Sequence, residues 1–252
     1  MKDLLINAKH ILDEFKSIKT NNSTAAKNLT NQDLAKYFDH TLLSNDATPT
    51  EIEKYTLEAI NADCASICVH PAYIDVAQNI LREHKQTKVK LCAVASFPLG
   101  ANLINTKLSE IRVLSDLGVE EIDFVAPIYL IKTRNWSALE KEFSLIRAAT
   151  STCLKVILET CLLSDLEKII ASLIAINCGI NFLKTSSGFS KSGATIKDIR
   201  LLKLVASGKV KIKASGGIKT KRFALDLITA GADRIGASQS ISIINEKYKN
   251  MI

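Results

Sequence analysis

The sequence predicts a (β/α)8 barrel, an α/β fold of eight parallel strands and eight helices, with an additional N-terminal helical segment. From about residue 30 onward, eight strand-like segments alternate with helix-like ones, and eight such units in roughly 220 residues suit this fold. The strand-like segments are nearly continuous apolar runs, as strands buried on both faces must be. A doubly wound open sheet is the alternative, but it usually has fewer strands, and no G-x-G-x-x-G follows the first strand here.

The predicted strands are short apolar runs, and each leads into a helix-like segment. A sizeable core can be buried, because 47% of the 252 residues are hydrophobic. The eight strands are expected at 38–43, 65–70, 89–97, 121–127, 154–160, 181–187, 210–217 and 233–238.

Two of the early helices have clear start signals. Thr48 fits an N-cap, Pro49 fits the first helical position, and Glu51 completes a capping box. Pro71 opens the helix after the second strand in the same way. These signals place a helix directly after each of the first two strands.

The later helices are recognised by helical spacing of apolar residues and by their ends. Gly118 and Gly179 are expected to end two of them, and Ser164 to cap the start of one. A last short helix is expected after the eighth strand. The other segments with helical spacing are 106–118, 138–150, 164–179, 195–207 and 220–231.

An extra helix is predicted at the N-terminus, before the alternation begins. Its apolar residues have helical spacing, and the polar run TNNST at 20–24 is expected to end it. Such a helix could cover a core or a partner subunit. We therefore divide the chain into an N-terminal helical extension, 1–30, and a barrel catalytic domain, 31–252. The apolar residues are Leu4, Leu5, Ala8, Ile11, Leu12, Phe15 and Ile18.

The composition argues against a nucleic-acid or membrane partner. The net charge is +7, but the basic residues are interleaved with acids, and only 6% of the residues are aromatic. No stretch is long enough to span a membrane, and the N-terminus lacks the apolar block of a signal peptide. We expect a cytoplasmic protein. The oligomeric state stays open, with a homo-oligomeric dimer or tetramer among the alternatives.

The six cysteines are expected to be free thiols in a reducing compartment. Most of them lie in apolar strand-like runs, and the chain is too long to need disulfides. No pair has the spacing of a zinc knuckle, and the four histidines do not cluster, so we expect no metal. The cysteines are Cys64, Cys68, Cys92, Cys153, Cys161 and Cys178.

Two lysines stand where a barrel enzyme places its active site, at the carboxyl ends of strands. Lys184 and Lys213 each end an apolar run just before a Ser-Gly turn. A lysine nucleophile must be neutral, whereas only about one free lysine in a thousand is neutral at pH 7. Burial and a neighbouring ammonium both favour the neutral form. With Asp123 to balance the remaining cation and relay protons, the trio suits Schiff-base chemistry on a carbonyl compound.

Other charged residues in the strands have plainer interpretations. Lys155 and Lys211 lie near strand starts, where a buried stem with a solvated head or an internal ion pair is more common. Asp39 and Glu159 could be catalytic, but a role in holding the lysines in place is favoured.

Three glycine- and serine-rich turns suggest a phosphate site. They are SSGF at 186–189, ASGGI at 214–218 and IGASQS at 235–240. Glycines allow close backbone approach, and the loops after strands seven and eight commonly bind phosphate in such barrels. Ordinary tight turns use the same residues, but the glycine pair together with Gly-Ala-Ser favours phosphate.

The order of these motifs resembles the deoxyribose-phosphate aldolase family. DHTLL, ICVHP, FPLG, EIDFV, KVILET, FLKTSSGF, IKASGGIKT and RIGAS occur in that order, over about residues 33 to 245. The resemblance implies a class I aldolase that uses neither metal nor cofactor. It would reversibly cleave 2-deoxy-D-ribose 5-phosphate to glyceraldehyde 3-phosphate and acetaldehyde, in deoxyribose catabolism.

The resemblance also implies roles for single residues. Lys184 would form the Schiff base, Lys213 would perturb its ionisation, and Asp123 would relay protons. The residues matched to substrate binding are Asp39, Cys68, Gly188, Gly216, Gly217, Gly236 and Ser238.

The chain departs from the family pattern at two places near the expected site. Gln239 stands where the family usually has a second small hydroxyl residue, and the loop 126–136 differs after strand four. The alternative within the same chemistry is a Schiff-base aldolase for another phosphorylated aldehyde. A sugar-phosphate isomerase or synthase and a basic nucleic-acid-binding protein are the rivals from other classes.

Overall fold

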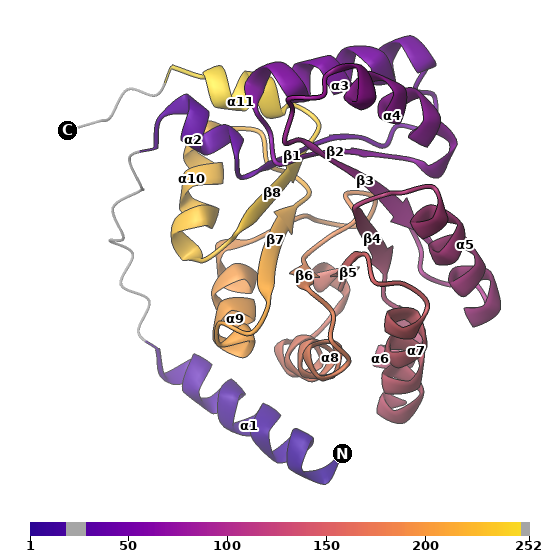
Figure 1. Cartoon of the computed structure of the whole chain (residues 1–252). Coiled ribbons are helices and arrows are strands. Elements are labelled where there is room, and N and C mark those ends of the chain that lie inside the picture. The colour runs from indigo at the N-terminus through magenta and orange to yellow at the C-terminus, as the bar shows by residue number, and fades with distance from the viewer. Residues whose placement is uncertain (19–28, 248–252) are drawn as a thin grey trace.

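The predicted fold class is confirmed by the computed structural model, which describes residues 1–18 and 29–247. Eight parallel strands close into a barrel in the order β1 to β8, with β8 paired to β1, and helices surround it (Figure 1). The strands are β1 Phe38–Leu42, β2 Ser66–Val69, β3 Lys90–Ala95, β4 Glu121–Val125, β5 Cys153–Ile157, β6 Phe182–Lys184, β7 Lys211–Ser215 and β8 Arg234–Ala237.

The helix starts predicted at Thr48 and Ser164 are confirmed, whereas the one predicted at Pro71 lies three residues later. Thr48 and Ser164 each form a complete capping box, with Glu51 and Glu167 respectively. Pro71 opens a short 3-10 turn, Pro71–Tyr73, rather than the α-helix that follows it. The helices are α1 Lys2–Ser17, α2 Asn31–Ala35, α3 Pro49–Ala62, α4 Ile74–Glu83, α5 Ile104–Asp116, α6 Ile128–Lys132, α7 Trp136–Ala148, α8 Asp165–Asn177, α9 Ile196–Ala206, α10 Lys221–Ala230 and α11 Ser240–Asn245.

The sequence did not predict α2 and α6. Each has only five residues, too few for the apolar periodicity that identifies a helix. The predicted strands also extend beyond the observed ones, most clearly at β6, where Thr185 and Ser186 already belong to the turn. There the Thr185 hydroxyl donates to the backbone carbonyl of Ser215 at the end of β7, and the Ser215 hydroxyl donates to the backbone carbonyl of Ser186.

The main apolar core lies between the strands and the surrounding helices. The interior of the barrel is instead polar on one side and lined by a small separate apolar cluster on the other. That cluster comprises Leu43, Cys68, Cys92 and Val94, with Phe97 packed against it.

The strand register places the candidate site residues at the same level of the interior. Lys184 pairs with Lys213 across β6 and β7, and Asp123 pairs with Lys155 across β4 and β5. Because side chains alternate between the two faces of a strand, residues two apart share the interior face. The fold therefore gathers charged groups from neighbouring strands at one point.

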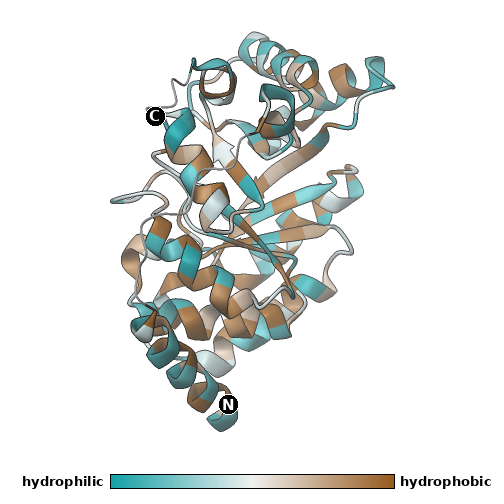
Figure 2. Ribbon diagram, turned by 90° about the vertical axis from the view of Figure 1, so that its left-hand side faces the viewer, coloured by the Kyte–Doolittle hydropathy of each residue, from teal (hydrophilic) through white to brown (hydrophobic). Residues whose placement is uncertain are grey.

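The predicted N-terminal helix is present as α1, which lies outside the barrel against α8 and α9 (Figure 1). Its Ala8 is fully buried, and apolar and polar bands alternate along it (Figure 2). Its packed apolar residues are Leu4, Leu5, Ile11, Leu12 and Phe15. The TNNST segment at 20–24 lies outside the described residues, and the division into 1–30 and 31–252 stays a prediction.

Two general expectations can be compared with the structure. All six cysteines are free. Among the helices in the described part of the chain, none combines the length and the apolar character needed to cross a membrane.

Candidate active site

Lys184 ends β6 with its side chain almost completely buried. Its Nζ lies 2.7 Å from Oδ2 of Asp123 on β4, and only 2% of the residue is exposed. The lysine is therefore compensated by a carboxylate inside the barrel, which explains how an apolar strand can end in a cation.

Asp123 is the centre of the site. Its Oδ2 accepts from both Lys184 and Lys213 at 2.7 Å, and its Oδ1 accepts from Lys155 at 2.7 Å. Burial alone would raise the pKa of Asp123, but the three ammoniums bring it well below the usual range. Asp123 is therefore an ionised carboxylate in the resting site.

Lys213 is held by two carboxylates. Its Nζ lies 2.5 Å from Asp39 and 2.7 Å from Asp123. Burial disfavours the cation, but Asp123 and Asp39 outweigh it and raise the pKa of Lys213. Gly236 makes room for this side chain, because a Cβ at Gly236 would lie 2.9 Å from Cε of Lys213. The ammonium of Lys213 is a fixed positive charge beside Lys184.

Three further charged residues complete the cluster, namely Lys155, Glu121 and Arg234. Lys155 is fully buried and contacts Glu121 at 2.7 Å, which confirms the internal ion pair expected for it. Arg234 contacts Asp39, and its Nη2 lies 2.9 Å from Glu121. Lys211 differs, since it is exposed and its Nζ lies over the ring of Phe182.

Sequence reasoning missed Glu121 and Arg234, although a signal for them exists. Glu121 lies two residues before Asp123 on β4, and Arg234 lies two residues before Gly236 on β8. Residues two apart share a strand face, so both had to point into the barrel if their neighbours did.

The thiols of Cys68 and Cys92 lie side by side next to the charged cluster. A hydrogen bond with Cys92 lowers the pKa of Cys68, whereas burial raises that of Cys92 well above its usual value. Along residues 1–18 and 29–247, the one group with metal-ligand spacing is these two thiols with Asp123. Three ammoniums already occupy Asp123, and Lys155 lies 3.2 Å from the Cys92 sulfur, so a metal cation would be repelled there.

An open hollow of about 430 Å³ lies above the cluster, at the carboxyl ends of the strands. Lys184 borders it, whereas Lys213, Asp123, Asp39 and Cys68 lie behind it and are absent from its lining. The hollow is also lined by the glycine- and serine-rich turns, including Gly188, Gly216, Gly217, Gly236 and Ser238, and by Lys219 and Gln239.

The turns around the hollow are held by close backbone packing. A Cβ at Gly193 would lie 2.0 Å from the carbonyl oxygen of Gly216, so the two loops approach more closely than any side chain allows. Glu159, itself buried, accepts from the amide and hydroxyl of Ser187. The sequence predicts that Glu159 holds the lysines in place, whereas these hydrogen bonds join it to the turn that follows Lys184. Gly193 and Lys219 were not identified from the sequence.

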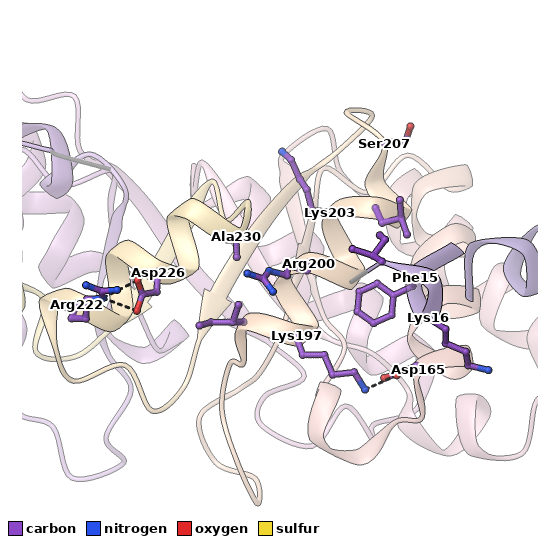
Figure 3. Close-up of a pocket in the computed structure, with 13 residues that line it drawn as sticks. Phe15, Lys16, Asp165, Lys197, Arg200, Lys203, Ser207, Arg222, Asp226 and Ala230 are labelled. Carbon is purple, nitrogen blue, oxygen red and sulfur yellow. Dashed lines mark hydrogen bonds and ion pairs between the residues drawn. The ribbon is translucent and has the colours of Figure 1, made fainter. Parts of the chain in front are cut away.

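A larger hollow of about 1020 Å³ lies outside the barrel, among α1, α9 and α10 (Figure 3). Its charged residues form ordinary exposed pairs, such as Lys197 with Asp165 and Arg222 with Asp226. It is remote from the strand ends and contains none of the catalytic candidates, so the smaller hollow is the candidate active site.

Comparison with known proteins agrees with this geometry. Residues 34–243 match the model of the family described as DeoC/LacD family aldolase. A deoxyribose-phosphate aldolase of Dictyoglomus turgidum is 45% identical, over 84% of this chain and 96% of the relative. One of Finegoldia magna is 43% identical, over 84% of this chain and 99% of the relative.

A solved structure extends the likeness to almost the whole chain. The tetrameric deoxyribose phosphate aldolase of Aeropyrum pernix has a TM-score of 0.77 and 27% identity, and the match covers 96% of each chain. The family match, by contrast, begins after α1. The barrel, its lysine-bearing strands and these relatives together show that the chain belongs to the DeoC/LacD family of aldolases.

Proposed function

We propose that this aldolase reversibly cleaves 2-deoxy-D-ribose 5-phosphate to D-glyceraldehyde 3-phosphate and acetaldehyde, with Lys184 as the Schiff-base residue. The observation that carries the proposal is the position of the Lys184 amine. It borders the open hollow and at the same time touches the ionised carboxylate of Asp123. The other lysines of the cluster, Lys155 and Lys213, lie behind that surface.

The first step is attack of the neutral Lys184 amine on C1 of the open-chain aldehyde. A new C–N bond forms, the carbonyl oxygen receives one proton from the amine nitrogen and one from solvent, and it leaves as water to give an iminium ion. The buried ammonium of Lys213 stays charged throughout, because two carboxylates hold it. It therefore favours a neutral group rather than a second cation at Lys184.

The second step breaks the bond between C2 and C3. The electron pair of this bond moves into the iminium to form an enamine on Lys184, and the C3 hydroxyl becomes the aldehyde of glyceraldehyde 3-phosphate. The hydroxyl proton passes through water to the carboxylate of Asp123, which Lys213 contacts at 2.7 Å. Protonation of C2 and hydrolysis of the iminium then release acetaldehyde and restore the lysine.

The phosphate is proposed to bind in the turns that line the rest of the hollow. Gly188, Gly216 and Gly217 have φ values of 93°, 85° and 73°, which side-chain-bearing residues rarely adopt. Such turns present backbone amides to an anion. Lys219 adds a positive charge, and Gln239 occupies the position where the family usually has a small hydroxyl residue.

The proposal requires no metal or cofactor, because the lysine iminium itself accepts the electron pair. The tetramer of the Aeropyrum pernix relative supports an oligomeric assembly, and the free cysteines support a reducing compartment such as the cytoplasm. No nucleic-acid partner is proposed.

The test is a retro-aldol assay combined with chemical trapping. The purified protein is incubated with 2-deoxyribose 5-phosphate and borohydride, and the modified peptide is identified by mass spectrometry. We expect release of acetaldehyde and reduction of the adduct on Lys184. Labelling confined to another lysine, or cleavage only of a different phosphorylated aldehyde, would overturn the residue or the substrate assignment respectively.

A further inference from the structure

A chain of ion pairs connects Lys184 with the opposite end of the barrel. Lys184 shares Asp123 with Lys155, and Lys155 contacts Glu121 at 2.7 Å. Glu121 in turn contacts Arg234 at 2.9 Å. A second branch runs from Lys213 through Asp39, which also contacts Arg234. Arg234 and Glu121 thus close the cluster at its far side.

Arg234 and Glu121 do not face the substrate. They line a different hollow, of about 890 Å³, together with the first residues of several strands. That hollow opens at the amino ends of the strands, whereas the active-site hollow opens at the carboxyl ends. Neither residue borders the active-site hollow, so any effect on catalysis must travel through the cluster.

The cluster contains one more cation than it has carboxylates. Three carboxylates face four cations, and all seven side chains are at most 13% exposed. An unbalanced charge in such a dry environment is costly. If Lys184 is neutral, three cations face three carboxylates. The carboxylates are Asp39, Glu121 and Asp123, and the cations are Lys155, Lys184, Lys213 and Arg234.

The contacts indicate which cation loses its proton. Lys155 lies within 3.8 Å of three carboxylates, and Lys213 and Arg234 contact two each. Lys184 contacts one carboxylate, Asp123, which it shares with two other ammoniums. Of the four cations, Lys184 therefore has the fewest carboxylate contacts.

We propose that Arg234 and Glu121 are positioning residues, which set the net charge around the Lys184 amine from the far end of the barrel. Resting on the proposed function, this inference assigns control of the nucleophile to the whole cluster rather than to Lys213 alone. Arg234 supplies the cation that balances Asp39 and Glu121. Without it, Lys184 would have to retain its own proton to balance the carboxylates.

The surrounding titratable groups do not alter this balance. Lys90 approaches Glu121 at 3.5 Å, but its side chain is 47% exposed, so water screens its charge. Glu159 lies outside the ion-pair chain and bonds to Ser187. The remaining titratable groups near the cluster are the thiols of Cys64, Cys68, Cys92 and Cys153 and the charged residues at the rim of the hollow at the amino ends, which are Lys203, Lys209, Lys211 and Asp233.

The test uses two substitutions with opposite expected effects. Arg234→Gln removes a cation, so Lys184 should hold its proton more firmly. In the pH profile of the single-turnover rate, the acid limb, where the rate falls as Lys184 becomes protonated, should therefore move to higher pH. Glu121→Gln removes a carboxylate and should move the same limb to lower pH. We expect a shift of about one pH unit in each case, a tenfold change in rate on the acid limb.

Two further variants separate charge from structure. Arg234→Lys keeps the charge and should keep the limb near its wild-type position. The double variant Arg234→Gln/Glu121→Gln restores the balance and should bring the limb back toward wild type. Loss of rate without a shift in either single variant, or shifts in the same direction, would overturn the proposal. If Arg234→Gln does not fold, the direction of the Glu121→Gln shift decides alone.

The wild-type protein distinguishes this inference from the function on which it rests. If wild type neither cleaves 2-deoxyribose 5-phosphate nor is trapped on Lys184 by borohydride, the proposed function fails. If wild type does both and the variants show unshifted profiles, the proposed function stands and the role of Arg234 and Glu121 is wrong.

Discussion

The interior of the barrel and the larger hollow among α1, α9 and α10, here called the groove, contain the same kind of ion pair in different surroundings. Lys184 and Asp123 lie 2.7 Å apart with side chains 3% and 0% exposed. Lys197 and Asp165 also lie 2.7 Å apart, but their side chains are 63% and 25% exposed. Equal distance between the charged atoms therefore does not mean equal energy or equal chemistry.

Water makes the difference between the two regions. An exposed pair is screened and contributes about 0–1 kcal/mol to stability. Removing one partner of a buried pair leaves an uncompensated charge and costs about 3–5 kcal/mol. The groove is the larger hollow, but the interior is where protonation can be controlled, because each charge there must be balanced by another protein group.

The largest expected effect comes from removing Lys184, the proposed nucleophile in the interior. Lys184→Ala should lower the retro-aldol rate by about 10⁴-fold or more, because the covalent route is lost. Borohydride trapping should disappear with it. The measurement is single-turnover cleavage of 2-deoxyribose 5-phosphate, and near-normal turnover by this variant would contradict the assignment.

Removing the central carboxylate should destabilise the fold. Asp123→Asn leaves three ammoniums without their shared partner and should cost about 3–5 kcal/mol at pH 7. Since the folded-state pKa of Asp123 is lowered, its stabilisation is present above the unfolded value of about 3.9 and is lost as the pH falls through the lower folded value.

The stability of both proteins can be measured by denaturant unfolding at pH 7 and at progressively lower pH. The difference between wild type and Asp123→Asn should shrink as the pH falls below the unfolded value. A difference that stays constant across this range would mean that the carboxylate charge is not the source of the stabilisation.

Removing the fixed ammonium beside the nucleophile should affect rate more than fold. Lys213→Leu keeps bulk but removes charge, and should lower the single-turnover rate about 100-fold at pH 7, with partial recovery as the pH rises. Lys213→Arg keeps a charge in a different place and should do less harm. Equal loss at every pH for the Leu variant would instead assign Lys213 to proton transfer or substrate binding.

The smallest effect is expected in the groove. Lys197→Ala breaks an ion pair of the same length as the one in the barrel, but should change the free energy of unfolding by less than about 1 kcal/mol. Turnover should be unchanged. A loss comparable to that of Asp123→Asn would break the comparison between the two regions.

The strands, the two lysines and the carboxylates Asp39 and Asp123 could be predicted from local sequence, whereas the burial of Glu121 and Arg234 could not. Strands buried on both faces form apolar runs, so Lys184 and Lys213 stand out within them. Glu121 and Arg234 stand at strand starts, where a charged residue normally faces solvent. Their burial depends on closure of the barrel, which brings β8 beside β1 and makes Arg234 a neighbour of Asp39.

The shape of the hollow was also beyond the sequence. The motifs indicated glycine-rich turns, but not that Gly193 packs against the backbone of Gly216, since these residues are distant in the chain and meet only in the folded barrel. The hollow is lined by Lys184 but not by Asp39, although both stand on strands that reach it. Whether a residue borders the hollow depends on how far it lies below the carboxyl end of its strand in the folded barrel. The sequence alone does not give that distance.

The close packing of Lys213 against Gly236 limits how the substrate preference of this barrel can be altered by mutation and selection. One position serves two needs, because Gly236 borders the hollow on one side and leaves room for the lysine chain on the other. A library that enlarges residue 236 to reshape substrate preference would displace Cε of Lys213 at the same time. Variation aimed at new substrates is therefore better directed to Gln239, which borders the same hollow and is exposed.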